Sequence, residues 1–99
     1  NTAGGLVLQE PAADLAAVAA LVSSMKNSPM RNRCALCGEI GLTGEIRGVP
    51  YIEKRVSEAL RLGMERVVIP EINRKHIDSS DARIIGVRTV KEAAQLLFV

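Results

Sequence analysis

Two cysteines, Cys34 and Cys37, come nearest to a recognisable chemical site, because their spacing occurs in half of a zinc site and in redox pairs. A structural zinc ion binds four ligands, and the single histidine, His76, is the only other candidate ligand of this kind. Residues three apart in an extended strand also point to opposite faces, so the two thiolates could not bind one ion together. The sequence therefore predicts two free, buried or half-buried thiols and no metal site.

The remaining nucleophiles do not indicate a hydrolytic site. His76 follows polar residues 73–75 and has no evident acid or nucleophile as a partner, so we expect a solvated side chain. No serine stands in the Gly-x-Ser-x-Gly setting of a nucleophile elbow; the serines are Ser23, Ser24, Ser28, Ser57, Ser79 and Ser80. The glycines form no phosphate-binding loop either, because no Gly-Lys-Ser or Gly-Lys-Thr sequence follows them.

The composition is that of one small domain. The 99 residues are 47% hydrophobic and 24% charged, which is typical of a soluble globular chain, and we expect one domain over residues 1–99. Tyr51 and Phe98 are the only aromatic residues, so the core must be aliphatic and a platform for base stacking is not expected. A net charge of +2 permits contact with a polyanion without requiring it. No apolar run approaches the roughly 20 residues of a membrane span, so no membrane contact is predicted.

A glycine-rich ribbon followed by a helix is the clearest structural pattern. Residues 38–50 alternate polar and apolar side chains around glycines, which predicts a tight β-ribbon. Its expected inward side chains are Ile40, Leu42, Ile46 and Val49. The next helix is expected over residues 51–62, with Gly63 as its cap. Its inward side chains are Ile52, Val56, Ala59 and Leu60, and its outward ones Glu53, Lys54, Glu58 and Arg61. Lys54 and Glu58 are expected to pair weakly.

The other segments complete an α/β fold. Strands are expected at residues 3–8, 34–37, 67–69 and 84–87, and further helices at 12–26 and 90–97. The β-branched run from Val67 to Ile69 is typical of a strand covered on both faces. The polar residues 71–81 predict a loop, and Thr89-Val90-Lys91-Glu92 fits a capping box. A strand, a helix and a strand in this order predict parallel pairing with a right-handed crossover.

Several stretches of the sequence resemble one family, and they follow in the order found there. They are Asn1 to Gly5, Glu10 to Ala16, Gly38 to Val56, Val67 to Pro70 and Ile85 to Val87. Together they span almost the whole chain and are similar to the C-terminal, Lon-protease-like domain of the RadA/Sms family of DNA-repair ATPases. The resemblance implies a Lon proteolytic-domain-like fold, of the ribosomal S5 domain 2-like kind. It also implies that this domain is truncated at its N-terminus and is the C-terminal part of a longer protein.

The resemblance also implies which residues stand at the positions of the Lon catalytic pair. Lon-type proteases use a serine that a lysine activates, and the serine lies in a Gly-Pro-Ser-Ala-Gly stretch before a buried helix. The comparable stretch here places Ala12 at the serine position, and the register after the ribbon places Glu53 at the lysine position, beside Lys54. A methyl group cannot attack a carbonyl, so we expect a protease fold without protease chemistry. The alternatives are a Ser/Lys peptidase whose dyad lies elsewhere and a stand-alone interaction module.

Expectations about partners come from the family alone. Its members form hexameric rings in recombinational repair, which implies a homo-oligomer and contact with single-stranded DNA or recombination intermediates and with a RecA-type recombinase. ATP, Mg and Zn are expected only in upstream domains of the parent protein, and no cofactor in this chain. The implied location is the bacterial cytoplasm, with an organellar homologue as the alternative. An edge left open near Leu6-Val7-Leu8 predicts self-association or marginal stability of the isolated chain.

Basic residues near the ribbon and the helix after it are the candidates for DNA contact. They are Arg47, Lys54, Arg55 and Arg61, with Arg31, Arg33, Arg74 and Lys75 on expected loops. Each can meet a phosphate as a sequence-independent cation. The alternative is a solvated charged face, because glutamates at positions 45, 53, 58 and 65 are interleaved with these cations.

Overall fold

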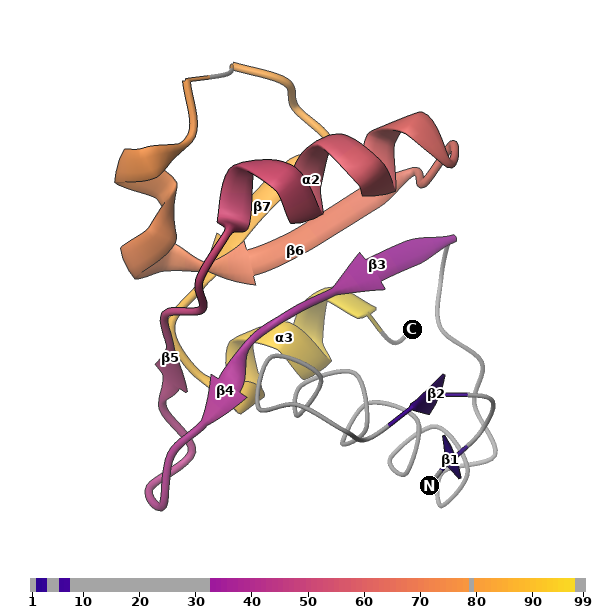
Figure 1. The fold of residues 1–99 in the computed structure, drawn as a ribbon. Helices are drawn as coiled ribbons and strands as arrows, with labels where there is room; N and C mark the ends of the chain where they lie inside the picture. Colours follow the sequence, from indigo (N-terminus) through magenta and orange to yellow (C-terminus); the bar gives the residue numbers. More distant parts are fainter. Residues whose placement is uncertain (1, 4–5, 8–32, 79, 98–99) are drawn as a thin grey trace.

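A computed structural model describes residues 2–3, 6–7, 33–78 and 80–97 of the chain (Figure 1). The described elements include both strands and helices, and from α2 onward the two alternate along the sequence, which confirms the predicted α/β class. The predicted helix over residues 12–26 lies outside the described residues. Among the helices that are described, none has the length and apolar character needed to cross a lipid bilayer.

Two very short strands lie at the start of the chain. They are β1 (Thr2–Ala3) and β2 (Leu6–Val7), and they pair with each other in antiparallel fashion. The prediction of one continuous strand over residues 3–8 is therefore wrong. Two glycines separate the strands in the sequence, and a Gly-Gly pair is a common hairpin connection that the apolar alternation alone does not reveal.

A parallel sheet of three strands forms the centre of the fold, in the order β3, β6, β7. The strands are β3 (Cys34–Leu36), β6 (Arg66–Pro70) and β7 (Ile84–Val87). Ala35 pairs with Val67, and Val68 pairs with Ile85. The predicted parallel pairing is confirmed, and helix α2 (Ile52–Arg61) lies in the connection between β3 and β6.

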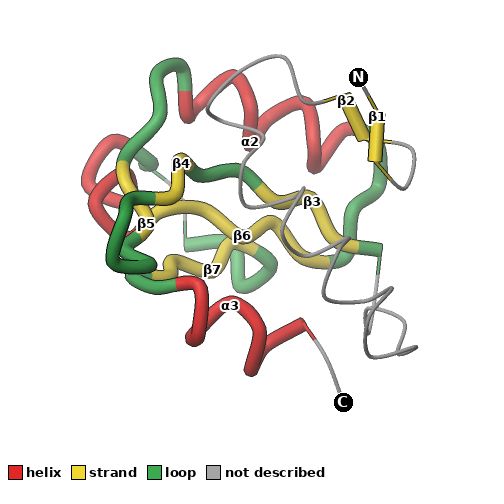
Figure 2. Tube along the Cα trace, turned by 90° about the horizontal axis from the view of Figure 1, so that it is seen from below, coloured by secondary structure: helices red, strands yellow, loops and turns green. Residues whose placement is uncertain are grey.

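Helices cover both faces of this sheet. Helix α2 lies on one face and helix α3 (Val90–Leu97) on the other (Figure 2). The side chains of β6 alternate between the two layers: Val67 and Ile69 pack in the cluster that contains α2, and Val68 packs in the cluster that contains α3. All three side chains are buried, which confirms the prediction of a strand covered on both faces.

The glycine ribbon forms the predicted hairpin. Its strands are β4 (Glu39–Ile40) and β5 (Ile46–Arg47). The Gly44 N–H donates to the Gly41 carbonyl at 3.1 Å, and Gly44 closes the turn with a φ of 84°. Ile46 and Val49 are buried as predicted, but Leu42 lies on the turn and is fully exposed. Its predicted inward orientation is wrong because the alternation of faces stops where strand pairing stops.

Helix α2 has the predicted amphipathic pattern. Ile52, Val56 and Ala59 are buried, and Leu60 packs against them. The predicted pair between Lys54 and Glu58 does not form. Instead the Arg61 Nε donates to a Glu58 carboxylate oxygen at 3.0 Å, because a planar guanidinium three residues further on reaches both oxygens of that carboxylate.

Gly63 ends helix α2, as the sequence predicts. It has a φ of 80°, and its N–H donates to the Leu60 carbonyl at 3.0 Å. The Met64 N–H donates to the Ala59 carbonyl at 3.2 Å, which completes a Schellman motif. The Met64 side chain packs against the same core cluster that contains Ala59. The cap therefore directs the chain from α2 back into β6.

A short 3-10 helix, η2 (Glu71–His76), stands where the sequence pattern predicts a loop, so the loop prediction is wrong for these residues. Ile72 is 60% exposed, whereas Asn73 is buried. A helix that turns a polar side chain inward and an apolar one outward has no hydrophobic period, and this is why the sequence does not indicate it.

The predicted capping box opens helix α3. The Glu92 N–H donates to the Thr89 hydroxyl at 3.1 Å. The Glu92 carboxylate accepts from the Arg88 N–H at 3.2 Å, one residue earlier than in the usual box. Ala93 and Leu97 are buried against the sheet, as predicted for the inward face of this helix.

Two isoleucines near the end of β6 offer a test of this packing. Ile69 is fully buried and Ile72 is 60% exposed. We expect Ile69→Ala to lower the free energy of unfolding by about 2–5 kcal/mol, because it leaves a cavity between the sheet and α2. The matched variant Ile72→Ala should cost less than about 1 kcal/mol. Urea denaturation followed by circular dichroism measures both, and equal losses would contradict the assignment of the core.

Candidate functional site

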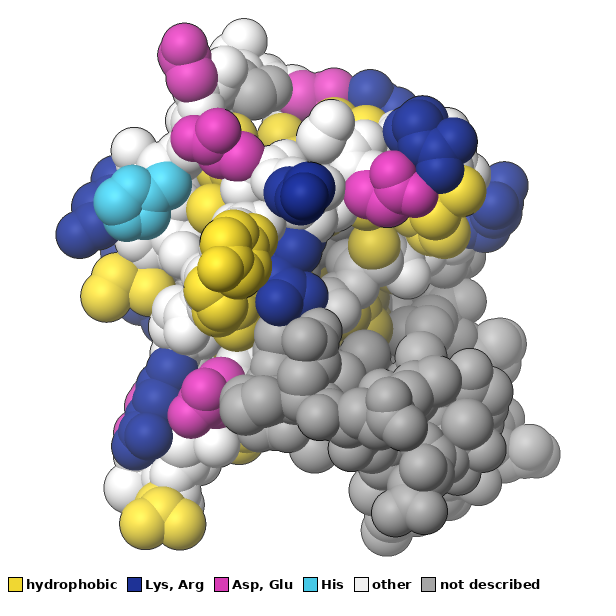
Figure 3. Space-filling view, in the orientation of Figure 1, with side chains coloured by type: hydrophobic (Ala, Val, Ile, Leu, Met, Phe, Trp, Pro, Cys, Tyr) yellow, Lys and Arg dark blue, Asp and Glu magenta, His cyan; other side chains and the backbone are white. Residues whose placement is uncertain are grey.

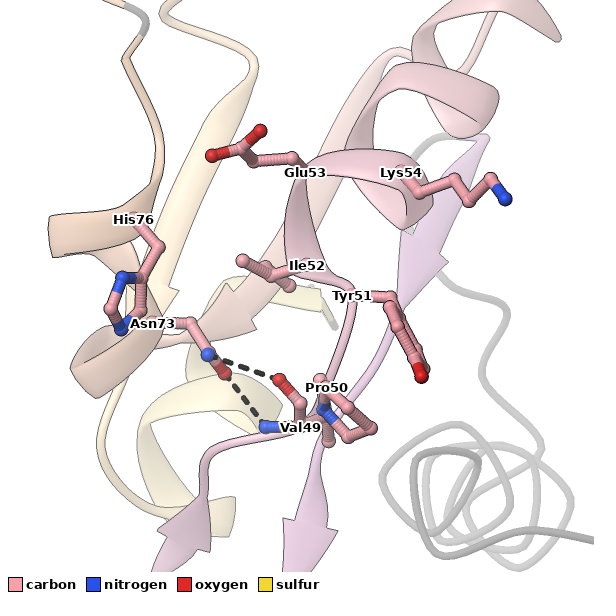
Figure 4. Close-up of a pocket in the computed structure, with 8 residues that line it drawn as sticks. All are labelled: Val49, Pro50, Tyr51, Ile52, Glu53, Lys54, Asn73 and His76. Atoms are coloured by element: carbon pink, nitrogen blue, oxygen red, sulfur yellow. Dashed lines mark hydrogen bonds between the residues drawn. The ribbon is translucent and has the colours of Figure 1, made fainter.

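A shallow groove of about 700 Å³ lies where the hairpin passes into α2, beside η2 (Figure 4). Its lining residues come from the junction, the first turn of α2, and η2: Val49, Pro50, Tyr51, Ile52, Glu53, Lys54, Asn73 and His76. The position that the family resemblance assigns to the Lon lysine falls in this groove. The groove is therefore the part of the described chain in which chemistry or binding is best sought.

The side chain of Asn73 fixes the floor of the groove. The Val49 N–H donates to its Oδ1 at 2.8 Å, and its Nδ2 donates to the Val49 carbonyl at 3.1 Å (Figure 4). Both partners are buried, so each hydrogen bond satisfies a group that water does not reach. A Cβ on Gly48 would lie 3.1 Å from the Ile72 side chain and 3.4 Å from Asn73 Oδ1, so a larger residue there would require these side chains of η2 to shift by a few tenths of an ångström.

Tyr51 stands in an unusual conformation at the rim of the groove. Its φ of 59° and ψ of 38° are left-handed, and it is the one residue other than glycine with a positive φ in the described part of the chain. Such a conformation costs an L-residue roughly 1–2 kcal/mol. The Tyr51 side chain is 76% exposed, so burial of the ring offsets little of this cost. Strain of this kind concentrates at functional positions.

Lys54 and Arg55 lie one helical turn after Tyr51. The Arg55 Nε donates to the Pro50 carbonyl at 2.8 Å, and its N–H donates to the Tyr51 carbonyl at 3.0 Å. Arg55 is half-buried and Lys54 is exposed. No carboxylate of the described residues forms an ion pair with Lys54. Among the described residues, Lys54 is therefore an exposed cation without an acidic partner.

The other two candidates for DNA contact already have acidic partners. Arg47, on β5, lies 3.3 Å from a Glu45 carboxylate oxygen and 3.9 Å from one of Glu39. Arg61, at the end of α2, pairs with Glu58; this pair raises the pKa of Arg61 and lowers the pKa of Glu58. In Figure 3, Lys and Arg side chains alternate with Asp and Glu side chains over much of the visible face. The structure thus places Lys54 and Arg55 together and leaves Arg47 and Arg61 apart from them.

The basic residues on the expected loops also differ in the partners that their side chains contact. The Arg74 Nη2 donates to the Ile84 carbonyl at 2.9 Å, and its Nε lies 3.6 Å from a Glu71 oxygen. The Arg33 Nη2 makes a longer contact of 3.5 Å with the Leu62 carbonyl. Lys75 is exposed on η2, and Arg31 lies outside the described residues.

Glu53 occupies the first turn of α2 and is exposed. Its carboxylate and the His76 imidazole extend to one side of the α2 start, whereas Tyr51 and Lys54 extend to the other (Figure 4). Among the described residues that line the groove there is no serine, threonine or cysteine. Ala12, which the family resemblance assigns to the position of the Lon serine, lies outside the described residues.

The two cysteines face opposite sides of the sheet, as the strand geometry predicts. Cys34 packs against the cluster that contains α3, and Cys37 against the cluster that contains α2. Both thiols are free and half-buried. Burial raises the pKa of the Cys37 thiol to about 11, although the nearby Arg55 charge acts in the opposite direction. In the described part of the chain, no cluster of three His, Cys, Asp or Glu side chains could hold a metal ion.

Sequence reasoning missed the roles of two residues. Asn73 lies within a polar run, and nothing in its neighbours distinguishes a buried asparagine from a solvated one. For Tyr51, the sequence pattern predicts only the first residue of a helix. Glycine, asparagine and aspartate are the residues that indicate a left-handed conformation, so a tyrosine gives no such signal.

Comparisons with known proteins agree on one family. Residues 2–97 match the Lon protease (S16) C-terminal proteolytic domain. The chain is 46% identical over 94 residues to DNA repair protein RadA of Listeria monocytogenes, which covers 94% of this chain and 21% of that protein. It is 45% identical over 99 residues to RadA of Streptococcus pyogenes, covering 99% and 22%. It is 42% identical over 102 residues to RadA of Chlamydia muridarum, covering 98% and 22%. The chain thus spans about a fifth of the length of these relatives.

The Asn73 hydrogen bonds can be tested by mutation. Asn73→Ala leaves the Val49 N–H and carbonyl buried without partners, and we expect it to lower the free energy of unfolding by about 1–3 kcal/mol. The matched control is Lys75→Ala, an exposed change on the same short helix, which should alter stability by less than about 0.5 kcal/mol. Urea denaturation compares the two, and a loss no larger for Asn73→Ala than for the control would contradict the role given to the amide.

The raised pKa of Cys37 predicts a loss of stability in alkaline solution. The unfolded chain releases this proton near pH 9.0 and the folded chain only near about pH 11, so rising pH favours unfolding within this window. The full shift corresponds to roughly 2–3 kcal/mol. We expect Cys37→Ala to flatten the fall in unfolding free energy across this window, and Cys34→Ala to leave it steep. Denaturation curves at a series of pH values decide this, and identical slopes for both variants would contradict it.

Proposed function

The chain belongs to the family of Lon protease C-terminal proteolytic domains, and on that premise we propose that it is a non-catalytic Lon-like domain of a RadA-type DNA-repair protein. In this proposal it serves subunit assembly and contributes an auxiliary contact to DNA. The layering of α2, a parallel sheet and α3 supports the ribosomal S5 domain 2-like architecture that the resemblance implies.

The position of Glu53 is the observation that best supports the proposal of a non-catalytic domain. A Lon-type mechanism needs a basic amine to take the proton of the serine. At the assigned position this chain has an exposed carboxylate on the first turn of α2, and Lys54, the adjacent amine, extends to the opposite side of the helix start (Figure 4). Ala12 at the serine position supports the same proposal from the sequence.

The role in repair follows from the relatives. Those compared above carry the name DNA repair protein RadA, and this chain spans about a fifth of their length. We therefore propose a parent protein that acts in recombinational repair in the bacterial cytoplasm. Its ATPase activity, with Mg and Zn, belongs to other domains, and its partners include a RecA-type recombinase. A ring of six subunits is the proposed assembly, to which this domain contributes intersubunit contacts.

The proposed DNA contact centres on Lys54 and Arg55. Lys54 is exposed, and no described carboxylate pairs with it. Arg55 lies beside it, held by the Pro50 carbonyl. Lys54 can displace counterions from a phosphate on binding, whereas Arg47 and Arg61 would first have to leave their glutamates. The contact proposed is independent of base sequence.

Binding of fluorescent single-stranded DNA across a salt series tests this contact. We expect affinity to fall steeply as salt rises. Lys54→Gln combined with Arg55→Gln should weaken binding at low salt and reduce the slope of log K against log salt by about 1.4, since each lost phosphate contact contributes about 0.7. The matched control, Arg47→Gln with Arg61→Gln, removes the same charge and should change the slope less.

Three outcomes would count against the proposed contact. If the control pair reduces the slope as much as the Lys54 and Arg55 pair does, net charge alone governs binding. If the single variant Lys54→Gln leaves both the affinity and the salt slope unchanged, Lys54 is not in contact with phosphate. If the unaltered chain does not bind at low salt, DNA contact lies elsewhere in the parent protein and this domain serves assembly alone.

A further inference from the structure

The exposed ring of Tyr51 is the feature of the described surface that the family assignment leaves without a role. The ring is 76% exposed, and its backbone is held in a left-handed conformation. Tyr51 and Lys54 extend to the same side of the α2 start (Figure 4). Lys54 lies on the first turn of α2, and the Arg55 N–H donates to the Tyr51 carbonyl at 3.0 Å, so both cations are close to Tyr51 along the chain. In Figure 3, hydrophobic surface adjoins Lys and Arg side chains in the region of the α2 start.

The small number of aromatic residues predicts no base-stacking platform, but the exposure of Tyr51 beside cations favours a single stacked base. We propose that Tyr51 stacks on one base of single-stranded DNA while Lys54 and Arg55 meet the phosphates on either side of that base. The inference rests on the DNA contact proposed above and names the chemistry of its site. An aromatic ring flanked by cations is the combination that single-strand-binding proteins use, because every base has a π-face and every nucleotide a phosphate.

The surroundings of the ring favour an anionic partner. The groove contains one carboxylate, that of Glu53, and it extends to the opposite side from Tyr51 (Figure 4). A phosphate beside Lys54 would therefore not face Glu53 directly. The Pro50 carbonyl accepts from Arg55, which holds that guanidinium close to the residue before Tyr51.

The junction is also held in place in advance. Asn73 binds both backbone groups of Val49, two residues before Tyr51, and the Tyr51 carbonyl accepts from the Arg55 N–H. A backbone that is already positioned loses less conformational freedom when its side chain binds. The sequence contains one tyrosine, one phenylalanine and no tryptophan, so a single stacked base is the most that this surface provides. The contact should be short and tolerant of sequence.

Single strands should be preferred over duplexes. In a duplex both faces of a base are covered by its neighbours, and a surface ring reaches a base face only after unstacking. Phosphate contacts remain available in either form. The proposal therefore separates the two kinds of contact: the ring contributes to single-strand binding alone, whereas Lys54 and Arg55 contribute to both.

Variants of Tyr51 test the proposal on the full chain. Asparagine tolerates the left-handed conformation, so Tyr51→Asn removes the ring while keeping the backbone, which a thermal melt verifies. We expect Tyr51→Asn to weaken binding of an oligothymidylate by roughly five- to 150-fold, the range of one lost base–aromatic stack. Tyr51→Phe keeps a π-face and should retain the affinity. Neither change removes a charge, so the salt slope should stay the same.

Tyrosine fluorescence provides a direct second measurement. Tyr51 is the single tyrosine of a chain without tryptophan, so the intrinsic emission reports on this ring alone. We expect an oligothymidylate to quench this emission, and a hairpin duplex of matched length to quench it much less at equal saturation. Binding of that duplex should be the same for Tyr51→Asn and for the unaltered chain.

The outcomes separate this inference from the function on which it rests. If the unaltered chain binds with a steep salt dependence, but Tyr51→Asn binds equally well and the emission does not change, stacking is refuted while the phosphate contact stands. If nothing binds at low salt, both fail. If Tyr51→Asn alters the sedimentation of the chain and leaves DNA affinity unchanged, the ring contacts a protein, and the stacking role is wrong.

Discussion

The amide of Asn73 holds the point at which the hairpin becomes helix α2. It pairs with both backbone groups of Val49 in a place that water does not reach, where either group left alone would destabilise the fold. Because Val49 is fixed, the chain enters Pro50 in one direction, and the left-handed Tyr51 then turns it into the helix. The positions of Glu53, Lys54 and Arg55 follow from that turn. One side chain on a short 3-10 helix thus orients the whole candidate surface.

Much of the fold can be predicted from the sequence, because buried apolar residues recur along it at the spacing of a strand or a helix. The β-branched run of β6, the amphipathic stripe of α2, the Gly63 cap and the Thr89 capping box each combine a local pattern with a physical cause. Leu42 and η2 could not be predicted in this way. Leu42 continues an alternation that the turn interrupts, and η2 depends on hydrogen bonds between residues far apart in the sequence. Within the candidate site, the sequence identifies the basic residues near the ribbon and α2. It does not reveal which of them have carboxylate partners in the fold.

Those carboxylate partners distinguish cations that the net charge counts alike. Four cations near the ribbon and α2 are equivalent in the sequence, yet two of them are neutralised by neighbouring glutamates in the fold. Residues 2–97 match the Lon protease C-terminal proteolytic domain, and at the start of α2 the Glu53 side chain extends to one side while Tyr51 and Lys54 extend to the other.

The parallel pairing of the central sheet also bears on how the chain acquires its structure. Ala35 pairs with Val67, and Val68 pairs with Ile85, so each contact in this sheet closes a long segment before it brings any stabilisation. The hairpin of β4 and β5 closes locally and can form early, whereas β3 has no partner in this sheet until β6 has been synthesised. During translation the apolar side chains of β3 would therefore remain uncovered for longer than those of any other strand of the sheet. This interval is where a nascent chain of this topology is most exposed to aggregation and most dependent on chaperones.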